Sequence, residues 1–236
     1  MKILAIDSSS LAASCALLEN RKMVGEFYID ARLTHSQTLM PMIESLLSST
    51  QTKLEDVDVI AVSCGPGSFT GLRIGIACAK GLAYGAGKPC AGISTLEGLC
   101  RNLEGLEGTA CAVMDARREQ VYTAAYSLDD LSAPLFPDQA ISIQELGEKL
   151  QALPRPIHLV GDGAELCYRQ LKDTVDGMKI ARESVRMQHA YSVGLAALTL
   201  AEKGALCTAG ELAPVYLRLS QAEREKAEKS SEIKGE

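Results

Sequence analysis

The sequence predicts an α/β protein made of two similar halves, each a mixed sheet flanked by helices. Three observations support this prediction. The 236 residues are 47% hydrophobic and 23% charged, which supplies apolar material for one large or two ordinary cores. Strand and helix patterns alternate through the first hundred residues in the order β-β-β-α-β-α-β-α. After residue 109 this order returns although the residues do not repeat, so we expect a repeat of topology.

The first predicted strands form an antiparallel meander and comprise residues 2–7, 13–19 and 22–30. An amphipathic helix follows, whose apolar positions recur every three or four residues. These positions are Leu39, Met42, Ile43 and Leu46. Pro41 either kinks a helix that begins near His35 or lies in the first turn of a helix that begins later.

The rest of the first half surrounds a glycine loop. Residues 57–64 form a nearly continuous apolar run, typical of a strand that is covered on both faces. The loop Gly65–Gly71 leads into a helix that ends near Gly85. Residues 88–94 then predict another strand, and residues 95–103 predict another helix.

The second half repeats this order, with elements at residues 109–116, 120–128, about 133–143, 142–151, 156–162, from 164 onward and 191–202. We divide the chain into a first domain, 1–103, and a second domain, 104–220, which includes the C-terminal helix and the segment Ala213–Arg218. Residues 221–236 carry alternating charges and predict a solvated, disordered tail.

Composition excludes several classes of protein. The 24 Lys and Arg residues against 30 Asp and Glu residues give a net charge of −6, without the basic excess of a stand-alone nucleic-acid binder. No apolar run reaches the roughly 18 residues that span a bilayer. Asp7 and three serines interrupt the apolar core that a signal peptide needs. We therefore expect a cytoplasmic protein without membrane contact.

The cysteine and histidine spacings predict neither a disulfide framework nor a metal site. The eight cysteines include no CxxC pair, so we expect buried, reduced thiols. His35, His158 and His189 form neither HxxxH nor HExxH, so no zinc or iron site is predicted.

The turn Asp7-Ser8-Ser9-Ser10 has two interpretations. Its backbone N–H groups and hydroxyls could cradle a phosphate while Asp7 held a hydrated magnesium ion. Alternatively it is an ordinary polar turn, since Asp and Ser are favoured in any turn. The residue types alone favour the ordinary turn.

The glycine loop nearly matches two nucleotide-binding motifs and satisfies neither. Gly65, Gly67 and Gly71 are spaced GxGxxxG rather than GxGxxG, and no Lys-Ser or Lys-Thr pair follows. Ser68 directly follows Gly67, which excludes a GxSxG nucleophile elbow. The helix N-terminus after the loop either attracts an anion or simply allows close packing of strand and helix.

The helix after this loop carries interior glycines, each of which costs about 1 kcal/mol relative to Ala. Small residues recur four apart in two series, Gly71, Gly75, Ala79 and Ala77, Gly81, Gly85. We expect this face to accept a partner helix, although packing on its own sheet is the alternative. An Arg at Gly75 or Ala79 should then abolish partner binding and leave the fold intact.

Two further turns follow predicted strands. Asp115–Glu119 is a charged turn between antiparallel strands, and its functional interpretation is a salt-bridged contact with the other domain. The turn Gly161–Ala164 repeats the glycine turn from strand to helix and is most often structural.

Seven segments together resemble the TsaB family, once called YeaZ, which is required for threonylcarbamoyladenosine in bacterial tRNA. They cover nearly the whole chain and read MKILAIDSS, THSQTLMPMIESLL, GPGSFTGLRIGIACAKGLAYG, GISTLEGL, DARREQVY, VGDGAE and APVYLR. The resemblance implies two RNase H-like halves, the architecture of actin and sugar kinases. It also implies a non-catalytic subunit that binds and activates a TsaD-type threonylcarbamoyltransferase, whose HxxxH motif this sequence lacks.

The resemblance places the partner contact on the helices at 35–49 and 70–86 and on the segment APVYLR. The residues that we assign to this contact are His35, Leu39, Met42, Leu46, Arg73, Gly75, Ile76, Ala79, Lys80, Tyr216 and Arg218. The resemblance also implies that the chain contacts a TsaE-type ATPase through the complex and tRNA only indirectly. It implies that the chain itself requires no cofactor. A homodimer and ATP or ADP at the partner interface stay open.

Two other functions stay open. The chain could be an ATP-using, kinase-like enzyme with Asp7–Ser10 as its phosphate loop. A peptidase is less favoured, because no Ser-His-Asp or Cys-His arrangement is readable in the sequence.

Overall fold

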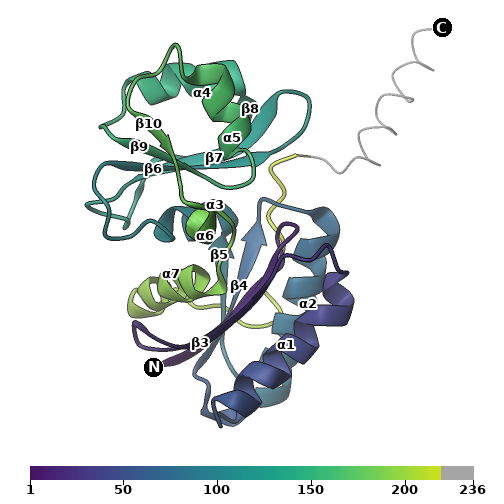
Figure 1. Ribbon diagram of the computed structural model, residues 1–236. Helices are drawn as coiled ribbons and strands as arrows, with labels where there is room; N and C mark the ends of the chain where they lie inside the picture. Colours follow the sequence, from purple (N-terminus) through teal and green to yellow (C-terminus); the bar gives the residue numbers. More distant parts are fainter. Residues whose placement is uncertain (219–236) are drawn as a thin grey trace, which may run out of the picture.

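A computed structural model describes residues 1–218 and shows two halves, one above the other (Figure 1). The first half contains β1 (Lys2–Asp7), β2 (Ala13–Glu19), β3 (Lys22–Ile29), α1 (His35–Ser49), the short 3-10 helix η1 (Leu54–Asp56), β4 (Val59–Gly65), α2 (Phe69–Ala86) and β5 (Cys90–Ser94). Its sheet has the strand order β3-β2-β1-β4-β5. Strand β2 pairs antiparallel with both β1 and β3, so the predicted meander is confirmed. Strand β1 also pairs parallel with β4.

The remaining elements are α3 (Thr95–Arg101), β6 (Thr109–Asp115), β7 (Gln120–Ser127), β8 (Pro134–Ser142), α4 (Ile143–Gln151), β9 (Ile157–Val160), α5 (Ala164–Leu171), β10 (Met178–Ile180), α6 (Glu183–Arg186) and α7 (Ala190–Glu202). The second sheet has the order β8-β7-β6-β9-β10, which repeats the first sheet strand for strand. The predicted repeat of topology is therefore confirmed. Strand β10 and helix α6 were not predicted, because three and four residues are too few to show a period.

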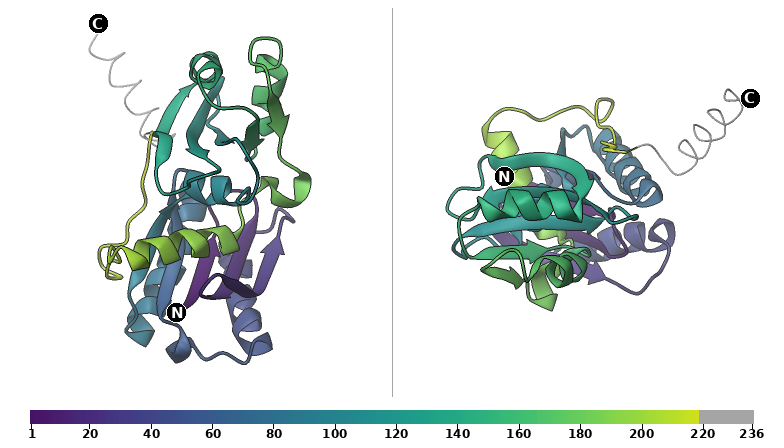
Figure 2. Two further views of the ribbon diagram at one scale, coloured as in Figure 1. Left: turned by 90° about the vertical axis from the view of Figure 1, so that its left-hand side faces the viewer. Right: turned by 90° about the horizontal axis from the view of Figure 1, so that it is seen from above.

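Helices cover both faces of each sheet (Figures 1 and 2). Helices α1 and α2 pack on one face of the first sheet, around Leu4, Ile6 and Ile60. Helices α4 and α5 pack on the outer face of the second sheet, in a separate core.

The C-terminal helix α7 packs on the first sheet, and this corrects the predicted domain assignment. Val193 and Ala197 of α7 share a core with Ile3 and Ala5 of β1, although the helix was assigned to residues 104–220. Conversely, α3 packs on the second sheet. Because α7 also touches α3, it is buried on two sides and needs two covering surfaces. The predicted boundary at residue 103 therefore does not separate two independently packed domains, because a helix from each side of it packs on the sheet of the other side.

Helix α1 begins at His35, so Pro41 lies inside it rather than in its first turn. A proline has no N–H to donate to the carbonyl four residues earlier. Because Pro41 is exposed, water can bond that carbonyl instead.

No helix within residues 1–218 combines the length and the apolar character needed to cross a membrane. All eight cysteines are free thiols, and six of them are buried. The predicted tail, 221–236, lies outside the described residues.

Candidate functional site

A cleft of about 390 Å³ opens between the two halves. Four segments form most of its lining: the turn after β1, the loop at 66–69, the turn after β6 and residues 215–218. Tyr122 and Asp162 complete it. The first and third segments follow equivalent strands of the two sheets. Ligands of open α/β sheets bind outside the carboxyl ends of the strands, so this cleft is where a small molecule would be sought first.

The side chains of the predicted phosphate loop are engaged within the chain. Asp7 is 1% exposed, and its Oδ1 accepts hydrogen bonds from the N–H and the hydroxyl of Ser9 at 2.9 and 2.7 Å. Its Oδ2 accepts the hydroxyl of Ser63. Burial above all raises the pKa of Asp7, while these hydrogen bonds oppose that rise. Ser8 donates to the carbonyl of Gly71, and Ser10 donates to Oε1 of Gln188.

Each of the four side chains of the turn is thus bonded to another group of the chain. Within residues 1–218 no group of three His, Cys, Asp or Glu side chains is arranged to hold a metal ion. The turn is therefore built as a structural element of this chain, and its role as a phosphate or magnesium site stays a prediction.

The glycine face of α2 packs on this same turn. A Cβ at Gly71 would lie 2.1 Å from the carbonyl oxygen of Ser8, and a Cβ at Gly75 would lie 2.4 Å from the Ser8 hydroxyl. Ala79, one turn further on, is fully buried in the first core. This corrects the prediction that Gly75 and Ala79 accept a partner helix. The glycines allow close packing within the chain, which was the alternative.

Other residues assigned to the partner contact are also internal. Leu39, Met42, Leu46 and Ile76 are at most 5% exposed and belong to the first core, because the stripe that marks a helix face marks the face toward its own sheet. His35 lies against the turn after β1, with Nε2 2.8 Å from the carbonyl oxygen of Ser10. The assignments of the four core residues are therefore corrected, whereas that of the half-buried His35 stays a prediction.

The exposed face of α2 carries different residues. Tyr84 is 87% exposed, and a Cβ at Gly81 or Gly85 would meet nothing within 4 Å. Together with the exposed Arg73 and Ala77, these residues form what we call the α2 surface. The series Ala77, Gly81, Gly85 was visible in the sequence, but Tyr84 was missed. Its signal was a large aromatic residue beside that series, seven positions after Ala77.

Helix α1 exposes a stripe that consists of Gln37, Pro41, Glu44 and Ser48. Lys80, the last residue of α2 in the predicted contact, is half-buried, and its Nζ donates to the carbonyl of Gly210 at 3.4 Å. Helices α1 and α2 lie side by side on one flank of the first half (Figure 1).

Residues 212–218, here called the C-terminal strap, cross the cleft from one half to the other. The N–H of Val215 donates to the carbonyl of Cys64 at 2.7 Å. Gly65 has φ +128°, and a Cβ there would lie 2.3 Å from the carbonyl oxygen of Val215, so the strap requires glycine at this position. At its other end, Arg218 donates from Nη1 to the carbonyl of Ala116 at 2.8 Å.

Tyr216 ties the strap to the start of α2. Its ring stacks on Phe69 with centroids 4.8 Å apart, and its hydroxyl accepts the Nε–H of Arg73 at 3.0 Å. The guanidinium of Arg73 lies 3.8 Å from the centre of the Phe69 ring. Tyr216 and Arg218 thus make contacts within the chain. The partner contact that the sequence predicted for them stays a prediction.

The turn after β6 faces the cleft and is held in an unusual conformation. Arg117, Arg118 and Glu119 have φ of 66°, 55° and 56°, in the left-handed region that non-glycine residues rarely adopt. Asp115 anchors the turn by accepting the N–H of Arg117 at 2.7 Å, and its own N–H donates to Asp162 at 3.0 Å. Burial is the largest cause of the raised pKa of Asp162, and the charge of Asp115 adds to it.

The two halves face each other across a cleft and have the RNase H-like fold that the sequence predicted. Component A of (R)-2-hydroxyglutaryl-CoA dehydratase from Acidaminococcus fermentans shares this fold, with a TM-score of 0.52 and 13% identity over 87% of this chain and 99% of that one. YeaZ from Pseudomonas aeruginosa superposes with a TM-score of 0.77 at 27% identity, over 92% of this chain and 99% of that one.

The sequence relatives give the family. The TsaB protein of Bacillus subtilis, a tRNA threonylcarbamoyladenosine biosynthesis protein, is 35% identical over 94% of this chain and 96% of its own length. The Escherichia coli protein of the same description is 40% identical over 55% of this chain and 57% of its own length. Residues 29–226 match the family model "TsaD: tRNA N6-adenosine threonylcarbamoyltransferase". The chain belongs to the TsaB family.

Proposed function

We propose that this chain is a non-catalytic subunit in the formation of threonylcarbamoyladenosine in tRNA, which binds and activates a TsaD-type transferase through the α2 surface. The observation that carries the proposal is Tyr84, a large ring that is 87% exposed beside glycines with open space above them. Tyrosine is enriched among the residues that dominate protein interfaces, and the open glycines beside Tyr84 allow a partner helix to approach closely.

The chemistry of the cleft supports a non-catalytic role. The side chains of the turn after β1 are bonded within the chain, and among residues 1–218 none are grouped to hold a metal. Catalysis would then belong to the partner. A TsaE-type ATPase would join through that partner, and tRNA would be contacted indirectly.

The experiment compares two arginine substitutions on exposed helix positions. Gly81→Arg places a long charged side chain on the α2 surface, and it should raise helix stability by up to about 1 kcal/mol because an interior glycine is removed. Gln144→Arg makes the same change of charge on α4, far from α2 in the fold. Each variant is mixed with a TsaD-type subunit, and complex formation and modified tRNA are measured.

Gly81→Arg should fold, fail to pair and fail to support modification, whereas Gln144→Arg should behave like the wild type. Pairing by Gly81→Arg at wild-type strength contradicts the proposed surface. The same chromatography without the transferase tests whether the chain forms a homodimer through this surface.

The cleft of about 390 Å³ favours one alternative, an ATP-using enzyme of the same fold. Magnesium-dependent ATP turnover by the pure chain supports that alternative. Saturable binding of ATP or ADP only when the transferase is present supports a nucleotide at the partner interface instead.

A further inference from the structure

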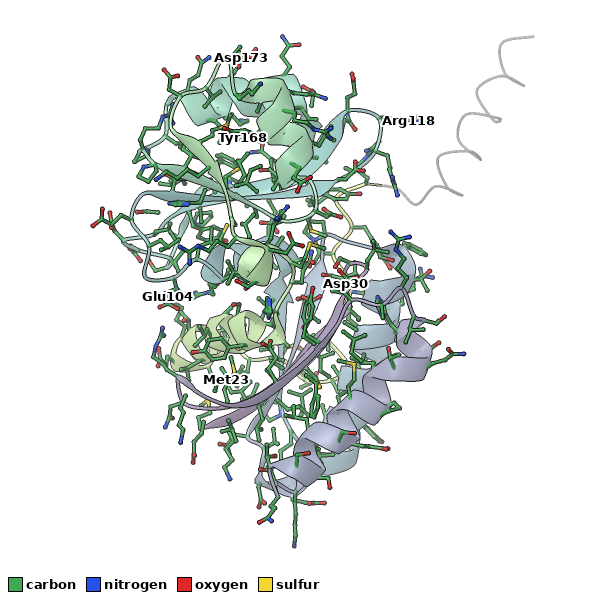
Figure 3. The ribbon with its side chains drawn as sticks, viewed as in Figure 1. Met23, Asp30, Glu104, Arg118, Tyr168 and Asp173 are labelled. Carbon is green, nitrogen blue, oxygen red and sulfur yellow. The ribbon has the colours of Figure 1, made fainter. Side chains whose placement is uncertain are left out.

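A second hollow, of about 510 Å³, lies on the flank where α7 passes between the halves. Met23 and Glu104, which both line it, are labelled on that flank in Figure 3. It shares no lining residue with the cleft described above and does not involve the α2 surface.

Apolar side chains form part of its wall, while two deeply buried polar side chains reach it. Met23, Val185 and Leu195 supply the apolar part. The Arg101 side chain is only 5% exposed and Ser192 only 3%, yet both line the hollow. Binding sites for small molecules are typically built in this way, from apolar walls and a few convergent polar groups.

Each of these two polar side chains has a hydrogen-bond donor without an acceptor among the described residues. Glu97 Oε1 holds Nε and Nη2 of Arg101, each at 2.9 Å, which fixes the guanidinium in place. Within residues 1–218 no partner is found for Nη1 of Arg101 or for the hydroxyl of Ser192. Glu97 already balances the charge of Arg101, so the two donors call for an acceptor with two oxygens, such as a carboxylate.

The carboxylates at the rim already have partners. Glu104 is bonded to Arg21, which joins the two halves across the mouth of the hollow. Glu26 accepts the N–H of Tyr191 at 3.0 Å and lies 3.1 Å from Nδ1 of His189. An anion that enters therefore meets rim carboxylates that are compensated by neighbouring donors.

We propose that this hollow binds a small monocarboxylate with an apolar body, whose carboxylate takes Nη1 of Arg101 and the hydroxyl of Ser192. The apolar body then covers Met23, Val185 and Leu195. This inference does not depend on the proposed partner or on activity in tRNA modification.

The test is a titration of the full chain with isovalerate, followed by amide chemical shifts. Saturable shifts are expected at Val185, Ser192 and Leu195, with a Kd on the order of 1 mM. Isoamyl alcohol, which has the same branched body without the charge, should bind about tenfold more weakly or not at all.

Variants separate the site from non-specific contact. Ser192→Ala and Arg101→Lys should each weaken binding about tenfold. Met23→Trp changes an exposed residue at the mouth, so it should fold normally and block binding even if a buried variant is unstable. Ser36→Ala on the surface of α1 is the control and should bind like the wild type.

The proposal is overturned if isovalerate gives no saturable shifts, if isoamyl alcohol binds equally tightly, or if folded Met23→Trp binds isovalerate like the wild type.

Discussion

Ala77 and Ala79 have the same side chain, lie two positions apart on α2 and have opposite surroundings. Ala77 is exposed on the α2 surface, whereas Ala79 is fully buried against the first sheet. A helix turns about 100° per residue, so two positions are enough to carry a side chain from solvent into the core. An identical substitution at these positions separates partner binding from folding.

Ala79→Arg should unfold the chain or destabilise it by more than about 3 kcal/mol, because it buries a charge without a partner in a filled core. Ala77→Arg should leave the thermal unfolding midpoint nearly unchanged. Circular dichroism during heating measures both. A folded Ala79→Arg variant with wild-type stability would contradict this prediction, because it would show that the core around α2 can accommodate the larger side chain.

A second residue-scale prediction concerns His189, which stands before the first turn of α7. The Glu26 carboxylate is the largest cause of its raised pKa, and partial burial opposes this rise. Protonated His189 therefore stabilises the folded state. That contribution is complete below the ordinary pKa of 6.5 and is lost as the pH rises through the higher pKa of the folded state.

The measurement is the difference in unfolding free energy between the wild type and His189→Gln across pH. The difference should be largest near pH 6 and should shrink toward about pH 8. Glu26→Gln in both backgrounds is the control, since it removes the carboxylate and should flatten the profile. A difference that grows with pH contradicts this assignment.

At the scale of elements, the C-terminal strap joins parts of the fold that otherwise meet across the cleft. It leaves the first core at Leu212, reaches β4 through Val215, covers the start of α2 with Tyr216 and ends on the second half at Arg218. One segment thus touches the cleft, both halves and the base of the α2 surface.

We predict that Tyr216→Phe costs about 1 kcal/mol of stability, because Arg73 loses its hydroxyl acceptor while the stack on Phe69 is kept. Tyr216→Ala should cost more, since the stack is lost as well. Chemical denaturation measures both changes. Equal stability of all three proteins would mean that the strap is only a connector.

At the scale of the whole molecule, the two halves exchange helices. Helix α7 follows the second half in sequence but packs on the first sheet, and α3 packs on the second sheet while it also touches α7. Neither half can lose these helices without exposing apolar surface of its own.

The halves should therefore unfold together. Val193→Ala removes buried methyl groups from α7 and should cost about 2 kcal/mol. Native-state hydrogen exchange should show the same loss of protection in β1 and in β6, although Val193 belongs to the first-half core. Loss confined to the first half would show two independent units.

The sequence determined the elements of this fold and their repeated order, because apolar periodicity and turn residues are local signals. The TsaB motifs determined the family in the same way. Which surface covers each element depends on the tertiary structure. Periodicity marks the apolar face of α1, α2 and α7 but does not say whether its own sheet, the other half or a partner lies against it. For this reason Leu39, Gly75 and Ala79 were assigned to a partner and are internal, while Tyr84 was missed.

The two buried donors at the second hollow come from α3 and α7, which are far apart in the chain, and only long-range packing brings Arg101 and Ser192 to one place.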